Sequence, residues 1–460
     1  MTRTLIKDLS SKRGEEASIS GWVDIRRDQG KMVFLDIRDV SGKIQSVVLP
    51  NSGGIETAKI IRPEWVVEVR GKVNERPEKN KAPGENGDIE LEVLTIKVLN
   101  SAETPGFDIS SDGKEIGEEA RLSARYIDLR RPRLQKNIRM RHKVAKLIRD
   151  VLDSENFIEV ETPLLTKSTP EGARDYIVPA RLYPGQFYAL PQSPQQYKQL
   201  LMSAGIERYF QLARCMRDED TRGDRQPEFT QLDIEMSFVE EEDVMKITEE
   251  LLIKIVTEFY PNKRIQTIPF PRIPYKEAIE KYNSDHPDIR EDKNDENLLA
   301  FCWIVDFPFF EKTPDGSWTF THNPFSAAKS EHQIDLIEGN NTEKIIAAQY
   351  DIVLNGLEVG GGSIRNHEPK ALKRVFETIG YSAEQIESNF GHMLKALASG
   401  TPPHGGIAWG FDRLMMILQN EPNIREVIAF PKTGEGKDLL MNSPSVVSDK
   451  QLKELHIKLG

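Results

Sequence analysis

The sequence predicts an α+β protein in which a small β-barrel precedes a larger domain with an antiparallel sheet flanked by helices. Five short segments of alternating apolar and polar residues occupy residues 17–98, separated by polar turns and loops. Such a series is typical of a small barrel. Further along the chain, strand-like segments are long and separated, and helical segments follow in groups, which favours an antiparallel sheet.

Length and composition narrow the class of protein. With 460 residues, of which 38% are hydrophobic and 29% charged, the chain can form two or three domains with their own cores. It contains no apolar run of about 18 residues, so we expect no membrane span. The N-terminal segment lacks an apolar signal core, which favours the cytoplasm. Cys215 and Cys302 are too few for a disulfide framework or a four-ligand zinc site, and we expect buried thiols.

The barrel domain is assigned to residues 1–103. Turns at 28–30 and 41–42 have hairpin chemistry. Five strands of this length suit the OB-fold, whose open face binds single-stranded nucleic acid. Phe34 would offer a ring for base stacking there, although core packing explains Phe34 equally well. Polar residues on or beside the same face would contact base edges: Arg26, Arg27, Gln45 and Glu90.

Residues 104–135 are predicted to form a hinge or linker, followed by a second domain at 136–460. Within a chain of net charge −11, the stretch 121–149 is rich in Lys and Arg and holds a single acid, Asp128. This basic island indicates either a phosphate-backbone contact or a helix with a solvated basic face. Apolar residues at helical spacing predict a helix at 138–155.

A hairpin is the most informative part of the second domain. Strands at 209–216 and 229–238 enclose a polar loop that carries three arginines, Arg217, Arg222 and Arg225. Beside them stand Asp218, Glu219, Asp220 and Asp224. The guanidinium fork suits phosphate oxygens, so the loop could clamp a nucleoside triphosphate; a solvated tip with self-neutralising charges is the alternative. Neither a P-loop nor a dinucleotide-binding glycine pattern is present.

Three segments resemble the signature motifs of class II aminoacyl-tRNA synthetases. The first is the helix at 138–155 leading to Glu161-Thr162-Pro163, and the second is the hairpin with Met216-Arg217-Asp218-Glu219. The third is Gly410-Phe411-Asp412-Arg413. The stretches LPQSPQQYKQ, DRQPEFTQLDIE, EVGGGSIR and GTPPHGG resemble the bacterial aspartyl-tRNA synthetases more narrowly, and the resemblance covers essentially the whole chain. It implies an OB-fold anticodon-binding domain before a class II catalytic domain.

The resemblance implies a two-step ligase reaction. L-aspartate and ATP would form aspartyl-adenylate and pyrophosphate, with Mg²⁺ bound, and the aspartyl group would then pass to tRNA-Asp. Because the substrate carboxylate itself attacks the α-phosphate, catalysis would consist of positioning and charge stabilisation. A non-discriminating enzyme that also charges tRNA-Asn stays open as an alternative. A cytoplasmic homodimer formed through the first motif is implied as well.

Two alternative functions, from other classes of protein, predict different sequence features. A non-catalytic RNA-binding relative would be expected to lack one of Arg217, Glu358, Arg365 or Arg413, and all four are present. A tRNA-independent amide-forming ligase on the same catalytic fold would lack the barrel domain.

Roles for the nucleotide site also follow from the resemblance. Arg217 and Arg413 would be catalytic, and Arg413 with Arg225 would hold the triphosphate. Phe229 would lie under the adenine, with the Arg413 guanidinium on its other side. Asp351 and Glu358, expected at the ends of one strand, would bind Mg²⁺. The implied ATP-binding set is Arg217, Asp218, Glu219, Arg225, Gln226, Phe229, Glu358, Gly410, Phe411, Asp412 and Arg413.

The aspartate carboxylate would be read by cations, for which Arg365 and Lys198 are the candidates. Glu171 lies on the loop 166–173, which in this family closes over the substrate. The implied aspartate-binding set is Glu171, Ser193, Gln195, Lys198, Arg217, Asp233, His322 and Arg365. The implied anticodon set is Arg27, Gln29, Phe34, Gln45 and Glu90.

The chain departs from the family pattern at two places. Asn323 stands where relatives usually carry a second histidine. Only residues 291–297 follow NSDHPDIR before the next strand, where bacterial relatives carry an additional domain. Because loops tolerate deletion, we expect activity with altered tRNA handling. The loop segment 220–224 has no implied small-molecule contact, and we expect it to meet the acceptor end of the tRNA.

Overall fold

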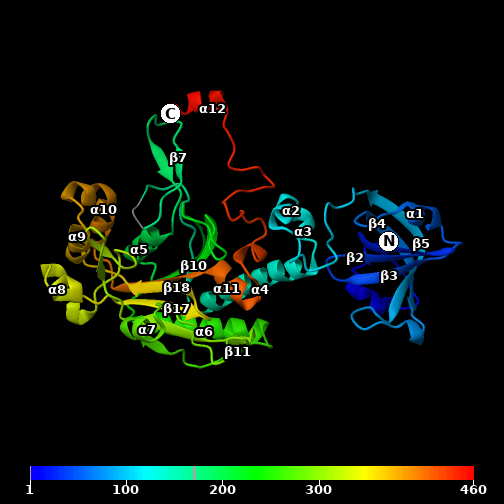
Figure 1. Ribbon diagram of the computed structural model, residues 1–460, viewed down its shortest axis with the longest axis horizontal. Helices are drawn as coiled ribbons and strands as arrows, with labels where there is room; N and C mark the ends of the chain where they lie inside the picture. Colours follow the sequence, from blue (N-terminus) through cyan, green and yellow to red (C-terminus); the bar gives the residue numbers. More distant parts are fainter. Residues whose placement is uncertain (1, 169–171, 460) are drawn as a thin grey trace. The chain divides into compact units, whose positions relative to one another are not determined.

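The structure is a computed structural model that describes residues 2–168 and 172–459 (Figure 1). The chain divides into two compact units, one ending at Asp108 and one beginning at Ile109. Residues 118–128, within the stretch expected to be a linker, form α2 (Glu118–Ser123) and α3 (Arg125–Asp128) in the second unit. Among the described residues, no helix is long and apolar enough to cross a membrane.

The first unit is a closed five-stranded barrel in the order β1-β2-β3-β5-β4, which confirms the barrel prediction. All neighbouring strands are antiparallel except β3 and β5. Its elements are η1 (Ile6–Lys12), β1 (Glu16–Gln29), β2 (Met32–Arg38), β3 (Lys43–Val48), α1 (Ile55–Ile60), β4 (Val66–Glu75), η2 (Glu78–Asn80) and β5 (Ile89–Asn100).

Alternation along β2 decides which side chains fill the barrel. Val33, Leu35 and Ile37 are buried in its core. Phe34 and Asp36 alternate with them and therefore point outward, because successive strand residues face opposite sides. Phe34 is only partly buried and lies outside the core cluster. The core-packing interpretation of Phe34 was therefore wrong.

The second unit is built on an eight-stranded sheet in the order β12-β14-β17-β18-β19-β10-β9-β6. Its six central strands are antiparallel, as predicted, and the pair at each edge is parallel. The strands are β6 (Ile158–Glu159), β9 (Arg208–Met216), β10 (Glu228–Ser237), β12 (Arg272–Pro274), β14 (Phe301–Val305), β17 (Gln349–Leu354), β18 (Leu357–Ile364) and β19 (His404–Gly410).

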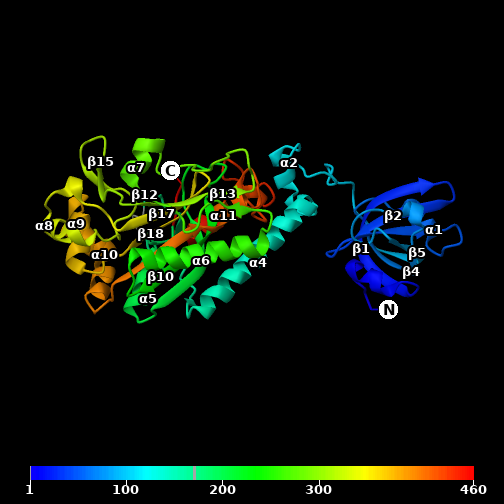
Figure 2. The same cartoon turned by 90° about the horizontal axis from the view of Figure 1, so that it is seen from below.

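Helices α4 and α6 lie side by side on one face of this sheet (Figure 2). Their apolar residues form one core with the inward side chains of the sheet, and α11 adds to it. The other longer helices are α5 (Gln195–Ser203), α7 (Tyr275–Tyr282), α9 (Pro369–Thr378) and α10 (Ala383–Leu397), with α4 at Pro132–Ser154, α6 at Glu241–Phe259 and α11 at Phe411–Leu418. Shorter elements are β7 (Ile177–Pro179), β8 (Phe187–Ala189), β11 (Arg264–Ile265), β13 (Leu298–Leu299), β15 (Phe310–Lys312), β16 (Trp318–Phe320), η3 (Ser330–His332), α8 (Gln333–Glu338), η4 (Thr342–Lys344), η5 (Ile424–Glu426) and α12 (Asp449–Glu454).

Helix α4 begins six residues earlier than predicted, at Pro132. Proline suits the first helical turn because it needs no hydrogen-bond acceptor there. Upstream, the guanidinium groups of Arg121, Arg125 and Arg131 surround the buried carboxylate of Asp128 at 2.7–3.1 Å. This part of the basic island is therefore a buried structural network.

Candidate active site

The predicted hairpin is formed by β9 and β10, whose last paired residues are Met216 and Glu228. Its loop, together with β18, β19 and the start of α11, encloses a cavity of about 320 Å³. The cavity floor is sheet backbone where side chains are small, at Gly360, Ala408 and Gly410. Flat backbone of this kind leaves room for a planar ligand against the sheet.

Three arginines line this cavity. The Arg217 guanidinium lies 5.1 Å from the centre of the Phe229 ring, and its Nε donates to the Gln192 carbonyl at 3.3 Å. Arg225 lies 3.6 Å from Glu219. Arg413 pairs with Asp224 at 2.9 Å and donates through Nη1 to the Glu358 carbonyl.

Two buried donors in the cavity wall lack acceptors. The Nε of Arg413 and the Nε2 of Gln226 are buried with no hydrogen-bond partner, while the Oε1 of Gln226 accepts from the backbone N–H of Lys432 at 2.7 Å. Unpaired buried donors are costly, so a ligand rich in acceptors fits this cavity. Phosphate oxygens and the acceptor nitrogens of a purine meet that requirement.

The structure brings most of the expected ATP-binding residues to this cavity. Two lie elsewhere: Asp218 pairs with Arg174 at 3.5 Å, and Phe411 is buried in the core. Asp412 reaches the cavity, but both its carboxylate oxygens are engaged by protein donors. The expected residues that line the cavity are Arg217, Glu219, Arg225, Gln226, Phe229, Glu358, Gly410, Asp412 and Arg413.

Asp351 and Glu358 are not at the ends of one strand, as expected, but on the neighbouring strands β17 and β18. The turn at Asn355-Gly356 has φ of +51° and +84°, the left-handed geometry that an Asn-Gly pair favours in tight hairpins. The two carboxylates meet above Gly361: a Cβ there would lie 2.9 Å from Oδ1 of Asp351 and 3.5 Å from Oε1 of Glu358.

This carboxylate pair has the chemistry of a divalent-cation site. Burial, together with the Glu358 charge, raises the pKa of Asp351 to about 7 against the opposing effect of His322. A hard cation would relieve such a pair. Within residues 2–168 and 172–459, no group of three or more His, Cys, Asp or Glu side chains is arranged as a complete metal site. Phosphate oxygens or water would therefore complete the coordination.

His322 lies beside the carboxylate pair. Its Nε2 is 3.6 Å from Oδ2 of Asp351, and its ring centre lies 4.5 Å from that of Phe307, with the two ring planes at 76°. The neighbouring Asn323 uses its Oδ1 to accept the backbone N–H of Phe325 at 3.0 Å. Asn323 therefore supports the local turn.

Four buried charged side chains form a second cluster on the same sheet. The Nζ of Lys198 is 2.9 Å from Asp233 and 3.3 Å from Glu235. Glu235 also holds Nε and Nη2 of Arg365 at 2.8 and 3.1 Å, and Nη1 of Arg365 donates to Ser363 at 2.8 Å.

Electrostatics differ between the two acids of this cluster. Burial opposes ionisation of Glu235, but Arg365 and Lys198 hold its pKa at about 2. Burial raises the pKa of Asp233 against the opposing charge of Lys198. Among the described residues, the Oδ2 of Asp233 and the Nε2 of Gln195 are buried and have no hydrogen-bond partner. Asp233 therefore offers an acceptor and Gln195 a donor to a ligand.

Sequence reasoning omitted Glu235 from the aspartate-binding set. Its signal was its position two residues after Asp233, which places both side chains on one face of a strand. The segment 220–224 was expected to meet tRNA rather than a small molecule, but Asp224 pairs with Arg413 and lines the cavity together with Asp220. His404 was not singled out.

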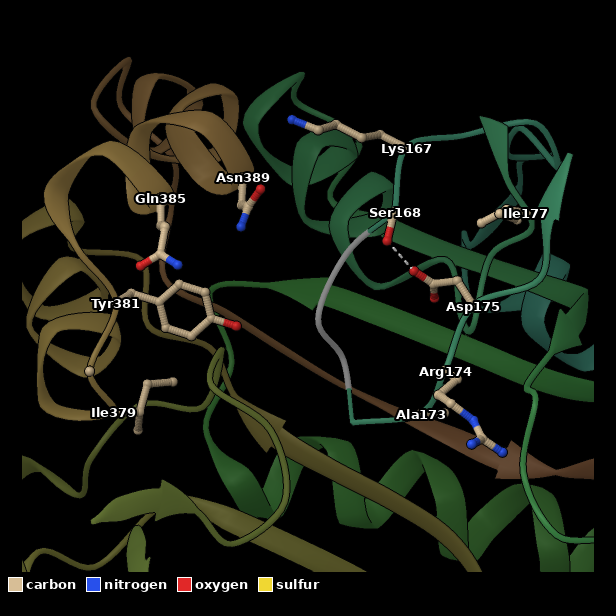
Figure 3. A pocket seen from close by; sticks show the side chains of 11 residues that line it. Lys167, Ser168, Ala173, Arg174, Asp175, Ile177, Ile379, Tyr381, Gln385 and Asn389 are labelled. Carbon is tan, nitrogen blue, oxygen red and sulfur yellow. Dashed lines mark hydrogen bonds between the residues drawn. The ribbon is translucent and has the colours of Figure 1, made fainter. Parts of the chain in front are cut away.

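A separate cleft is lined on one side by Lys167, Ser168 and residues of the stretch 173–177 and on the other side by residues of the stretch 379–389. Figure 3 shows Ser168 and Asp175 on one side of it and Tyr381, Gln385 and Asn389 on the other. Ser168 donates to Asp175, and Lys167 donates to the carbonyl of Ser388 across the cleft. Ser193 accepts the backbone N–H of Gln195 at 3.3 Å. The expected Glu171 lies outside the described residues.

The barrel face carries the other predicted set. Arg27 forms a bidentate pair with Asp36 at 2.9 Å and reaches Gln45 at 3.4 Å, and Gln45 donates to Glu90 at 3.2 Å. Arg27 and Phe34 are direct partners across β1 and β2, so their side chains share a face. Gln29 is exposed at the end of β1.

Comparison with known proteins places both units. Residues 117–434 match the family of tRNA synthetases class II (D, K and N), and residues 17–99 match the OB-fold nucleic acid binding domain. The chain is 40% identical to the aspartate–tRNA(Asp/Asn) ligase of Rubrobacter xylanophilus, covering 98% of this chain and 95% of that protein. It is 38% identical to the aspartate–tRNA(Asp) ligase of Deinococcus radiodurans, covering 100% and 99%.

The alignment with the Rubrobacter protein extends over 576 positions, although the chain has 460 residues. Segments of that relative therefore have no counterpart here.

Solved structures share the fold. A putative aspartyl-tRNA synthetase from Leishmania major superposes with a TM-score of 0.75 at 21% identity, covering 94% of each chain. Asparaginyl-tRNA synthetase from Pyrococcus horikoshii superposes with a TM-score of 0.74 at 23% identity, covering 94% of this chain and 98% of that one. With the sequence matches, these findings establish that the chain belongs to the class II tRNA synthetases and, within them, to the family of the aspartate–tRNA ligases.

Proposed function

We propose that this protein is an aspartate–tRNA ligase that activates L-aspartate with ATP and transfers the aspartyl group to tRNA-Asp. The observation that carries the proposal is the buried cluster of Lys198 and Arg365 on Asp233 and Glu235. The two acids of the cluster lie on β10, the strand that also contributes residues 229–231 to the wall of the arginine-lined cavity. The proposed site for the side-chain carboxylate of aspartate and the proposed site for the phosphates of ATP thus lie on one sheet.

Arg365 has donors to spare for a ligand. A guanidinium carries five N–H groups, and Glu235 and Ser363 take three of them. The remaining two suit the side-chain carboxylate of aspartate in a bidentate contact. The free Oδ2 of Asp233 suits the substrate ammonium. Glu171, Ser193, Gln195 and His322 complete the proposed aspartate-binding set.

For activation, Arg217 would hold the α-carboxylate and the α-phosphate, and Arg225 and Arg413 the rest of the triphosphate. The adenine would lie on Phe229. Asp351 and Glu358 would hold Mg²⁺, which supplies charge neutralisation on the phosphates. The protein's own contribution is alignment of the carboxylate with the phosphorus and preorganised positive charge for the departing pyrophosphate.

For transfer, the barrel face with Phe34 would stack an anticodon base, and Arg27, Gln29, Gln45 and Glu90 would contact base edges. We further propose a cytoplasmic homodimer formed through α4 and the edge strand β6, where Ile158 is 52% exposed. Closed two-fold dimers are the commonest oligomers.

The deciding experiment is aspartate-dependent ATP–pyrophosphate exchange without tRNA, with asparagine and lysine as control substrates. We expect exchange with aspartate alone. Arg365→Ala should abolish it, and Arg374→Ala, which removes a partly exposed arginine on α9, should not. Absence of exchange with aspartate would refute the catalytic proposal.

A non-discriminating enzyme is the second candidate, because relatives of both specificities match at similar identity. Charging of purified tRNA-Asp and tRNA-Asn separates the two. Phe34→Ala should raise the KM for tRNA by about 5- to 150-fold, since stacking on one base contributes about 1–3 kcal/mol, and should leave pyrophosphate exchange unchanged.

A further inference from the structure

Two facing rows of residues run along β10 and β19 beneath the proposed substrate. Asp233, Glu235 and Ser237 alternate on β10, and their partners across the ladder are Ala408, Gly406 and His404. Directly paired residues of antiparallel strands share a face. His404 therefore stands on the face that carries Asp233 and Glu235, at the end of the row beyond Glu235.

The His404 ring is held in one tautomer. Its Nδ1 lies 2.8 Å from the carbonyl oxygen of Pro402. A carbonyl oxygen can only accept, so Nδ1 carries the proton of the neutral ring and Nε2 carries the lone pair. The side chain is fully buried, and Nε2 has no hydrogen-bond partner in the structure. Nothing in the described surroundings stabilises a proton on Nε2 through a hydrogen bond.

His404 also holds Arg365 through the backbone. Its carbonyl accepts the backbone N–H of Arg365 at 2.8 Å. The charged or titratable neighbours of its ring are Glu235 on β10 and Arg365 and His367 after β18. Lys198 of α5 joins them through Glu235.

The negative charge on Glu235 is already balanced by two cations. Its carboxylate is shared between Arg365, at 2.8 and 3.1 Å, and Lys198, at 3.3 Å. A third cation beside it would compete with the guanidinium for the same oxygens. Burial, with Arg365 and His367, lowers the pKa of His404 against the opposing effects of Glu235 and Pro402. The ring is therefore neutral at pH 7 and gains a proton only on acidification.

We propose that His404 is a positioning residue for Arg365. The His404 ring must stay neutral for aspartate to be recognised, and its protonation therefore sets the acidic limit of aspartate binding. When Nε2 gains a proton, the imidazolium draws Glu235 away from Arg365, and the guanidinium loses the orientation that presents its two remaining N–H groups. This inference rests on the proposed function, and it concerns the side-chain carboxylate of the substrate.

The test is pyrophosphate exchange by the full-length protein from pH 8 to pH 5.5, with KM determined separately for aspartate and for ATP. For a coupling of ordinary strength, we expect the aspartate KM of the wild type to rise about 5–10-fold on acidification relative to the ATP KM. His404→Asn keeps an amide donor for Pro402 but cannot gain a proton, so its aspartate KM should stay within about twofold across the range. His456→Asn, which changes an exposed histidine that is not among these neighbours of the His404 ring, is the control and should follow the wild type.

Two results would overturn the inference. One is a His404→Asn variant with the same acidic rise as the wild type, and the other is a parallel change in both KM values. If the variant does not fold, histidine NMR titration of the wild type serves instead. By linkage, aspartate must then lower the pKa of one buried histidine, and no such shift would equally overturn it. Absence of aspartate-dependent exchange at every pH would instead refute the proposed function.

Discussion

The carboxylate of Asp412 joins the three motif segments of the catalytic unit. Its Oδ1 lies 2.5 Å from Nη1 of Arg141 on α4, 271 residues away in the chain. Its Oδ2 accepts the backbone N–H of Thr230 on β10 at 2.8 Å. Asp412 therefore fixes the start of α11 against both α4 and the β9–β10 hairpin.

Asp412→Ala should lower the free energy of unfolding by about 2–4 kcal/mol, because it leaves the Thr230 N–H without an acceptor and Arg141 without its partner. Urea denaturation measures this loss. Asp412→Asn keeps an acceptor for Thr230 and should lose less. Equal losses in the two variants would show that the bond to Thr230 contributes little.

Gly361→Ala should impair use of Mg·ATP without unfolding the protein. The new Cβ would lie 2.9 Å from Oδ1 of Asp351, so the carboxylate pair must shift, while the backbone at Gly361 is outside the left-handed region. We expect a KM for Mg·ATP raised at least tenfold in pyrophosphate exchange, with a steeper dependence on Mg²⁺ concentration. Gly434→Ala, where a Cβ meets nothing within 4 Å, is the control. An unchanged Mg²⁺ dependence would argue against a metal at this pair.

Removal of the metal gives a complementary measurement. Addition of EDTA should stop pyrophosphate exchange, and Mg²⁺ should restore it, because carboxylates and phosphates together bind the ion. Asp351→Asn should need more Mg²⁺ for half-maximal exchange than the wild type. Exchange that persists in EDTA would contradict the assignment of Asp351 and Glu358.

Substitution of Arg222 should affect the two steps of the reaction differently. Its backbone pairs with Arg225 at the hairpin tip, and it lies outside the residues that line the nucleotide cavity. Arg222→Glu should slow transfer to tRNA at least tenfold and leave exchange within about twofold, because phosphate contacts to RNA are electrostatic. Arg225→Glu, whose side chain lines the cavity, should impair both. Equal impairment of the two steps by Arg222→Glu would exclude a contact limited to tRNA.

Glu426 makes the stability of the catalytic unit sensitive to acid. Its carboxylate lies 2.6 Å from Arg121 and 2.8 Å from Arg133. Burial opposes ionisation, but these two arginines hold the pKa of Glu426 below its ordinary value. A depressed folded-state pKa gives stability that is present above the unfolded pKa, about 4.3, and is lost as pH falls through the folded pKa.

Glu426→Gln should therefore be less stable than the wild type by about 2 kcal/mol at pH 7, with the difference shrinking below about pH 4. Urea denaturation at a series of pH values measures it. Glu435→Gln, at an exposed ion pair with Lys437, should show no measurable change. A difference that persists at pH 3 would mean that the Glu426 charge is not responsible.

Much of this protein is encoded in local patterns. Alternation and turn residues predict the barrel strands and the β9–β10 hairpin, and the three motifs with their substrate segments indicate the family. These signals depend on a few neighbouring residues, so they survive without knowledge of the rest of the chain. Even the β17–β18 turn had a local signal in Asn355-Gly356, although Asp351 and Glu358 were expected at the ends of one strand.

Sequence alone determined the fold class, the family and the chemical types of the site residues. Only the tertiary structure decided their pairing: Glu235 holds Arg365 from 130 residues away, Asp224 engages Arg413, and Asp351 meets Glu358 above Gly361. It also turned three arginines of the basic island into a buried network around Asp128. The physical reason is that the partners of a residue across a sheet depend on strand order and register, and that burial determines how strongly each charge interacts with its partner. Both follow from long-range packing rather than from neighbouring residues.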